Sequence, residues 1–193
     1  MEKHMPQQIN AINGSQQENW LTRYYFVRAG FAAAWLVAAL TIGKGSASAS
    51  ALLLIGYPAW DALANFIDSK RSGGLAKNRT QLFNVLVSLA VALAIAGTLP
   101  DMHMVLGVFG AWAILSGLLQ LGTALRRWKS CGAQWAMILS GAQSALAGGF
   151  FIFQAQMPAV PSIVTVAGYA GFGAFYFLVS ALSLRFAAWR RQQ

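Results

Sequence analysis

The stretch MHMVLGVFGAWAILSGLLQLGTAL occupies residues 102–125 and contains no Asp, Glu, Lys or Arg. A helix needs about 20 mostly apolar residues to cross the hydrocarbon core of a bilayer, so this stretch predicts a transmembrane helix. The basic sequence RRWK follows it directly at 126–129. Lys and Arg at the end of an apolar run are typical of the cytoplasmic end of a membrane span.

Five further runs of similar length and composition are found on both sides of this segment. Together the predicted spans are Tyr24–Gly43, Ala49–Asp68, Gln81–Leu99, Met102–Leu125, Gln134–Met157 and Ser162–Ala187. Short connections rich in Gly, Ser and Pro separate them, which is typical of tight turns. The sequence therefore predicts an all-α integral membrane bundle of six transmembrane helices, arranged as three helical hairpins (24–71, 79–127 and 134–191). Residues 1–20 are polar and are expected to form a flexible segment ahead of a single domain, 21–193.

The composition agrees with a membrane protein. Hydrophobic residues make up 57% of the 193-residue chain and charged residues only 10%, whereas roughly a quarter of a soluble domain is charged. The net charge of +9 would suit a nucleic-acid-binding protein, but the basic residues flank the apolar runs instead of forming one basic face. We therefore expect the lipid bilayer, and no nucleic acid, as the partner.

Lys and Arg are distributed unequally between the two sets of loops. Thirteen of the fourteen lie at span ends or loops on one side, and Lys44 alone lies on the other. Because Lys and Arg concentrate in cytoplasmic loops, both termini are predicted to be cytoplasmic.

Several short motifs in the second half of the chain resemble a known family. Residues 110–117 read GAWAILSG, the pair Arg126-Arg127 follows, residues 135–141 read WAMILSG, and residues 181–185 read ALSLR after Gly168-Tyr169. These motifs resemble the HdeD-like acid-resistance membrane proteins of bacteria over spans three to six. The second span departs from the pattern with Pro58, Asp61 and Asn65.

The resemblance implies six helices in the bacterial inner (plasma) membrane and a link to acid stress. It supplies no catalytic residue to carry over, and the chain shows no phosphate-binding loop, zinc-ligand spacing or nucleophile–His pair. We therefore expect a non-enzymatic protein without a cofactor that acts in acid or stress resistance. It would act through the membrane, a second copy of the chain or another membrane protein.

Asp61 is the strongest candidate for a functional residue. It lies deep in the second span, where an ionisable side chain is unfavourable and marks a functional site by default. Asn65 and Asp68 follow at i+4 and i+7 on the same helix face. Arg28, about one turn inside the first span, could reach Asp68 or Asn65 and, at the far end of this set, Asp61. These residues form either the proton or ion site of a small transporter or channel, or a clamp between helices. Buried polar groups serve packing more often, so the clamp is the first interpretation.

Three uncharged polar residues, Asn84, Gln120 and Gln143, lie deep in three different spans. Facing one axis they would line a polar path; hydrogen bonds between helices are the commoner use. Small residues also recur at four-residue spacing in the fifth span, as in Ser140, Ser144 and Gly148. Such stripes let helices approach closely in lipid, and we expect this contact within one chain before a dimer interface.

The sequence Met102-His103-Met104 places thioether and imidazole groups together at the side opposite the termini. These groups suit copper(I), and His103 would titrate in an acidified periplasm. One short cluster is also what an ordinary loop provides, so no metal is assigned to the chain. The single cysteine, Cys131, excludes an intramolecular disulfide.

Overall fold

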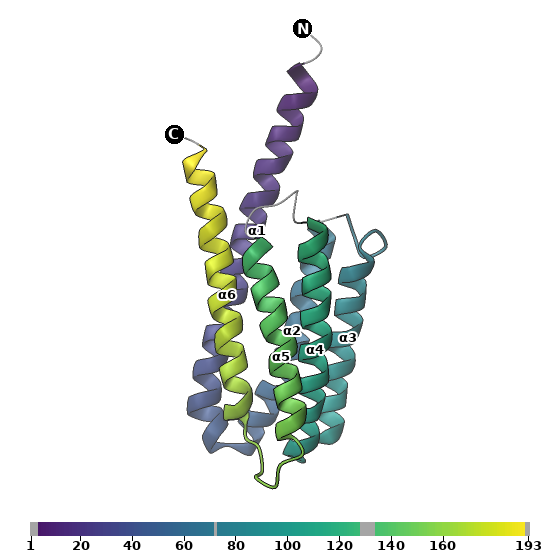
Figure 1. The fold of residues 1–193 in the computed structure, drawn as a ribbon, viewed down its shortest axis with the longest axis vertical. Coiled ribbons are helices and arrows are strands. Elements are labelled where there is room, and N and C mark those ends of the chain that lie inside the picture. The colour runs from purple at the N-terminus through teal and green to yellow at the C-terminus, as the bar shows by residue number, and fades with distance from the viewer. Residues whose placement is uncertain (1–3, 72, 128–133, 192–193) are drawn as a thin grey trace.

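The computed structural model describes residues 4–71, 73–127 and 134–191, so Cys131 lies outside the described residues. Throughout these ranges all regular structure is helical. The elements are α1 (His4–Ala38), the π-helical turn η1 (Ala39–Gly43), α2 (Ala47–Arg71), α3 (Arg79–Thr98), α4 (Met102–Arg127), α5 (Gln134–Gln154) and α6 (Ile163–Arg190). Within the described part of the chain, six helices are long and apolar enough to cross a membrane. The predicted six-helix bundle is thereby confirmed (Figure 1).

The first helix is longer than the first predicted span. It begins at His4 and runs through the segment for which the sequence predicts flexibility. Gln, Ala and Glu in this segment favour a helix, and Pro6 lies in the first turn, where proline is tolerated. Figure 1 shows α1 extending beyond the other helices, at the end of the bundle that carries both termini. There both terminal guanidinium nitrogens of Arg191 donate to the carboxylate of Glu18, which ties the end of α6 to α1.

Local sequence explains where the chain turns. Gly73 and Gly74 follow α2 with φ angles of 97° and 91°, a left-handed conformation that residues with a Cβ disfavour. Before α4, Asp101 Oδ1 accepts hydrogen bonds from the backbone N–H groups of His103 at 2.9 Å and Met104 at 3.2 Å. Asp101 therefore caps the first turn of α4.

The backbones of α4 and α5 touch at two levels. A Cβ on Gly117 would lie 2.5 Å from the carbonyl oxygen of Gly141, and a Cβ on Gly148 would lie 2.5 Å from that of Gly110. Between these levels, Ser144 Oγ donates to a backbone carbonyl of α4 at 2.9 Å. Gly141, Ser144 and Gly148 of the fifth span thus pack against α4 of the same chain, which is how small residues bring helices together in lipid.

The helices contact one another between the predicted hairpins as well as within them. The two helices of each predicted hairpin are in contact, but the most extensive contacts join neighbouring hairpins, α2 with α3 and α4 with α5. The contact of α1 with α6 is similarly extensive and closes the ring. The six helices therefore enclose one common interior, which brings together residues that are far apart in sequence.

Hydrophobic side chains fill the half of the bundle that lies away from the termini. The buried core lies at the end of α1, the start of α2, the end of α3, the start of α4, the end of α5 and the start of α6, and it includes Trp35, Leu54, Ile95, Phe109, Phe151 and Ile163. On the outside, large apolar side chains are exposed, among them Leu93 at 74% and Leu146 at 76%. An apolar outer face of this extent is suited to lipid. The polar site described below lies beside this core.

Candidate functional site

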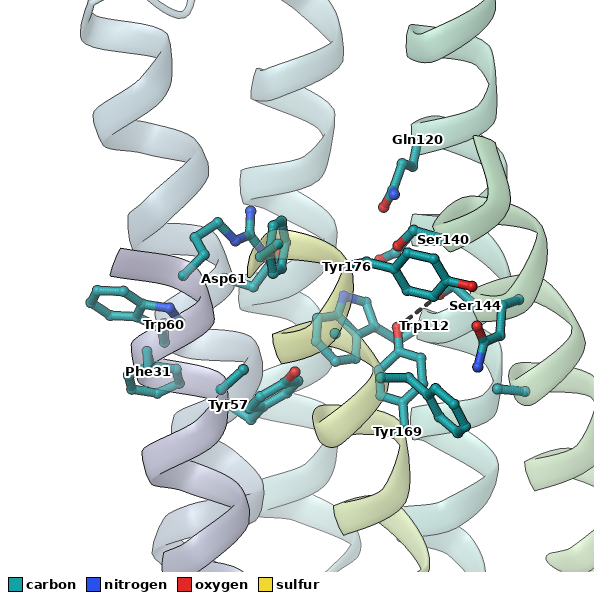
Figure 2. A pocket seen from close by; sticks show the side chains of 18 residues that line it. Phe31, Tyr57, Trp60, Asp61, Trp112, Gln120, Ser140, Ser144, Tyr169 and Tyr176 are labelled. Atoms are coloured by element: carbon teal, nitrogen blue, oxygen red, sulfur yellow. Dashed lines mark hydrogen bonds and ion pairs between the residues drawn. The ribbon is translucent and has the colours of Figure 1, made fainter. Parts of the chain in front are cut away.

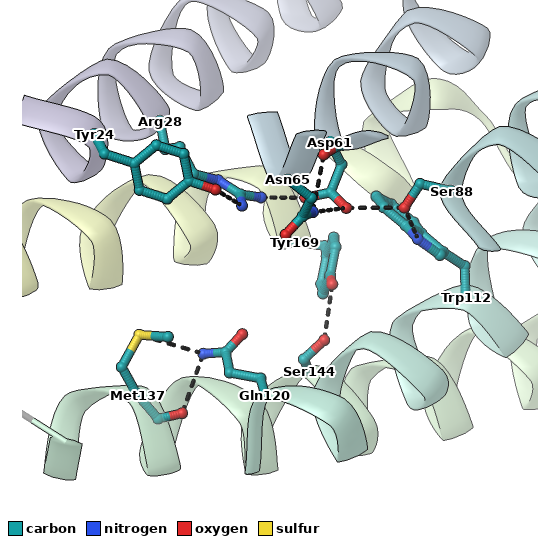
Figure 3. Close-up of polar contacts among 10 residues, drawn as sticks. All are labelled: Tyr24, Arg28, Asp61, Asn65, Ser88, Trp112, Gln120, Met137, Ser144 and Tyr169. Carbon is teal, nitrogen blue, oxygen red and sulfur yellow. Dashed lines mark hydrogen bonds and ion pairs between the residues drawn. The ribbon is translucent and has the colours of Figure 1, made fainter. Parts of the chain in front are cut away.

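Asp61 lies near the middle of α2 and is bonded by side chains from three helices. Its Oδ1 accepts from Nη2 of Arg28 on α1. Its Oδ2 accepts from Nδ2 of Asn65 at 3.0 Å, one turn further along α2, and from Oγ of Ser88 on α3 at 2.8 Å. Figure 3 shows these contacts converging on the carboxylate. A buried charge is tolerated only when it is paired and hydrogen-bonded, and Asp61 meets both conditions.

Arg28 is held in place by more than its ion pair. Its Nη1 donates to the hydroxyl of Tyr24 at 3.0 Å. Its guanidinium carbon lies 4.4 Å from the ring centroid of Phe177 on α6 and 5.6 Å from that of Tyr24. Cations over aromatic rings at such distances are attracted by the negative ring face. The Arg28 side chain therefore links α1, α2 and α6.

The hydrogen-bond network continues from Ser88 to α4. The indole Nε1 of Trp112 donates to Ser88 Oγ at 3.2 Å while the Ser88 hydroxyl donates to Asp61. Ser88 is 1% exposed and Trp112 is 3% exposed, so both polar groups depend on this chain of bonds. The network thus joins α1, α2, α3, α4 and α6, which is the arrangement expected of a clamp between helices.

Asp68 belongs to a different cluster. It is 7% exposed and accepts from Trp20 Nε1 at 3.4 Å and from Gln81 Nε2 at 3.1 Å. Arg28 pairs with Asp61, which lies at one end of the predicted set Asp61, Asn65 and Asp68. The carboxylates of Asp61 and Asp68 therefore have separate partners. Seven residues along a helix correspond to about 10 Å, which one guanidinium does not span.

An interior cavity of about 100 Å³ lies next to the Arg28–Asp61 pair (Figure 2). It is lined by side chains of α1, α2, α4, α5 and α6. A site that holds one water needs about 10–15 Å³, so this cavity has room for several waters or for one small solute. Its uncharged polar lining consists of serines, glutamines and tyrosines: Ser116, Gln120, Ser140, Gln143, Ser144, Tyr57, Tyr169 and Tyr176.

The cavity extends toward the end of the bundle that carries the termini. On α4 its lining runs from Trp112 to Gln120, eight residues or about 12 Å at the rise of an α-helix. In the opposite direction it meets the hydrophobic core, to which Tyr57 and Trp112 both belong. The polar space is thus closed off by apolar packing on the side away from the termini.

Two of the three residues predicted to form a polar path line this cavity. Gln120 donates to the carbonyl oxygen of Met137 on α5 at 3.1 Å, and Gln143 lies on the cavity wall. Asn84 is half-buried on α3, a helix that does not contribute to the lining. Ser144 and Tyr169 join the wall through a 2.8 Å contact between their hydroxyls.

The Met102–Met104 segment forms the first turn of α4. His103 Nδ1 lies 3.1 Å from the carbonyl oxygen of Ala155 at the end of α5, and Met104 is 56% exposed. Among the residues that the structure describes, no group of three or more His, Cys, Asp and Glu side chains is arranged to hold a metal ion. The geometry at His103 is that of a contact between the ends of α4 and α5.

Sequence reasoning missed several residues of the site. Ser88, Trp112 and Phe177 surround the ion pair, and none was singled out. One sequence signal could have found Tyr57 and Trp112. Aromatic side chains with polar tips usually lie at the membrane interfaces, whereas these two lie near the middle of their spans.

Comparisons with protein-family models, curated proteins and solved structures find no match to this chain. The interpretation of the site therefore rests on its own geometry: a paired carboxylate, and beside it a polar cavity within the membrane-spanning part.

Proposed function

We propose that this protein is a small transporter that takes a polar solute into the cavity beside Arg28 and Asp61 and moves it across the bacterial inner membrane. The observation that carries the proposal is the cavity itself, which brings together serine, glutamine and tyrosine side chains from four helices in the middle of the bundle. Clefts between helices with a few convergent polar groups are common ligand sites. Polar groups are costly in the membrane interior and mark solute paths there.

The position of the cavity supports transport over catalysis. Apolar packing closes it on one side, and it extends toward the other. A transporter that exposes its site to each side in turn needs such one-sided closure around a central site. With cytoplasmic termini, as the distribution of Lys and Arg predicts, the structure corresponds to a state whose outer half is closed.

Asp61 has a fixed role in this proposal. Both of its oxygens are bonded, so it acts as the counter-ion of Arg28 rather than as a free proton acceptor. The pair holds α1, α2 and α6 around the cavity.

Acid or stress resistance is the physiological setting that we propose, on the strength of the resemblance to HdeD-like proteins. A second candidate function within this setting needs no solute: the protein would act through the membrane or a partner protein. The network of five helices around Asp61 supports this alternative, because a rigid bundle suits a scaffold.

Filling the cavity separates the two candidates. Ala147→Leu places a larger side chain on the cavity wall, whereas Ala90→Leu places the same side chain at an exposed position of α3. In a deletion strain under acid stress, a transporter should lose rescue with Ala147→Leu and keep it with Ala90→Leu. Equal rescue by both, at equal amounts of inserted protein, would contradict transport through the cavity and favour the scaffold.

A further inference from the structure

The charges that line the cavity limit what it can hold. Arg28 and Asp61 are the ionised side chains of its lining, one positive and one negative, and they neutralise each other. A ligand with a net charge would add an uncompensated charge to a low-dielectric site, which is strongly unfavourable. A ligand that carries both charges adds no net charge, and each of its charged groups then needs a partner in the lining.

The aromatic lining favours a positively charged group on part of that ligand. Tyr57 and Trp112 both line the cavity and contact each other edge to face, with ring centroids 5.8 Å apart and an interplanar angle of 86°. Tyr169 and Tyr176 of α6 add further rings (Figure 2). Aromatic faces around a cavity attract cations, and quaternary ammonium groups are the best-known ligands of such cages. In this site the guanidinium of Arg28 already uses the face of Phe177 in the same way.

The supply of hydrogen-bond acceptors distinguishes a methylated ammonium from a primary one. A primary ammonium brings three N–H donors, and a carboxylate offers about four acceptor positions. At Asp61, three of these are taken by Arg28, Asn65 and Ser88. A primary ammonium would therefore depend on the neutral oxygens of the Ser, Gln and Tyr side chains in the lining. A quaternary ammonium has no N–H group and needs only aromatic faces.

The cavity can also receive a negative group. A guanidinium has five N–H donors, and the contacts with Tyr24 and Asp61 engage one on each terminal nitrogen of Arg28. Gln143, Ser116 and Ser140 bring further donors to the same wall. A carboxylate near Arg28 would therefore be stabilised by charge-assisted hydrogen bonds.

We propose that the ligand of the cavity is a betaine, a short zwitterion in which a quaternary ammonium is joined to a carboxylate. This inference rests on the proposed function and names its solute class. The ammonium lies among the rings of Tyr57, Trp112 and Tyr176, and the carboxylate lies toward Arg28. The Arg28–Asp61 pair stays intact, since the ligand brings no net charge.

The test measures binding and uptake of three radiolabelled probes by the full chain in liposomes: glycine betaine, choline and glycerol. Choline keeps the quaternary ammonium without the carboxylate, and glycerol is polar and uncharged. We expect saturable binding and uptake of glycine betaine above that of both other probes and of protein-free liposomes. Preference for choline or glycerol would overturn the betaine assignment and leave transport standing. No uptake or binding of any probe would count against the proposed function as well.

Variants of α6 test the aromatic contact. Tyr176→Leu removes a cavity ring, and Phe186→Leu removes a ring of the same helix that is 51% exposed and outside the cavity lining. We expect Tyr176→Leu to weaken glycine betaine binding about 5- to 30-fold, as loss of a cation–π contact implies, with Tyr176→Phe and Phe186→Leu close to the unaltered protein. Tyr176→Phe keeps the ring, so it remains informative if the Leu variant does not fold. Unchanged binding in folded Tyr176→Leu, or equal loss with Tyr176→Phe, would refute the role of the ring.

Discussion

Replacing Asp61 with Asn tests the ion pair that organises the site. The substitution keeps the shape of the side chain and removes the negative charge, so Arg28 loses its counter-ion in the middle of the bundle. Breaking a buried pair from one side costs about 3–5 kcal/mol, because an uncompensated charge stays behind. Both side chains keep 15% exposure, which places the effect at the lower end of this range. We therefore expect the free energy of unfolding to fall by about 3 kcal/mol.

The matched control is the second ion pair of the described chain, between Glu18 and Arg191. Its side chains are 37% and 57% exposed, and exposed pairs contribute at most about 1 kcal/mol. Asp61→Asn and the control variant Glu18→Gln are compared by reversible unfolding of the purified protein in mixed micelles. Arg28→Met and the double variant Arg28→Met/Asp61→Asn complete a double-mutant cycle for the buried pair. We expect a coupling energy of about 2 kcal/mol between Arg28 and Asp61. Equal losses for Asp61→Asn and Glu18→Gln, or additive single effects, would refute the reasoning.

Three further predictions test packing, the network and topology. Gly148→Ala places a methyl group against α4 and should destabilise the protein by about 1–3 kcal/mol. The control Gly149→Ala meets open space and should stabilise the protein by up to about 1 kcal/mol. Thermal unfolding compares the two variants, and equal effects would contradict the close approach of α4 and α5. Ser88→Ala leaves the indole of Trp112 without its acceptor and should lower the free energy of unfolding by about 1–3 kcal/mol. Thr98→Ala on the same helix should lower it by less than about 0.5 kcal/mol. A similar small loss of stability for both variants would argue against the network. A green fluorescent protein fused to the C-terminus should fluoresce and an alkaline phosphatase fusion should be inactive; the reverse would contradict cytoplasmic termini.

The six spans were predictable because membrane insertion depends on properties that single segments carry. A run such as 102–125 is apolar over the length of a bilayer core, whatever its neighbours are. The basic residues that follow this run and the glycines of the turn at Gly73-Gly74 are likewise local signals. The extension of α1 to His4 was not predictable in this way, since the residues ahead of the first span contain no apolar run of the length that marks a membrane helix.

The site depended on information that single segments do not carry. The depth of Asp61 in its span was enough to mark it, and the position of Arg28 in the first span placed it near the set Asp61, Asn65 and Asp68 without deciding its partner. The partners on other helices, Ser88 and Trp112, are set by the rotation and register of α3 and α4 against α2. Neither follows from hydrophobic patterns, because lipid-facing and protein-facing positions are both apolar here. The same limit applies to Asp68, which shares a helix face with Asp61 and has different partners.

The sequence presents a clamp and a proton or ion site as alternatives for Asp61. The observed contacts are those of a clamp, and they are compatible with the solute site proposed for the adjoining cavity. A lone carboxylate in the middle of the bundle would be unfavourable and would attract protons or cations. Paired with Arg28, it contributes no net charge to the cavity, so that under the proposed function the uncharged polar and aromatic side chains would decide which solute is bound. The pair also lies where the hydrophobic core meets the cavity, so movement of α1 or α6 during a transport cycle would act on it directly. A variant that weakens the pair should therefore change solute affinity as well as stability, whereas one that only fills the cavity, such as Ala147→Leu, should change affinity alone.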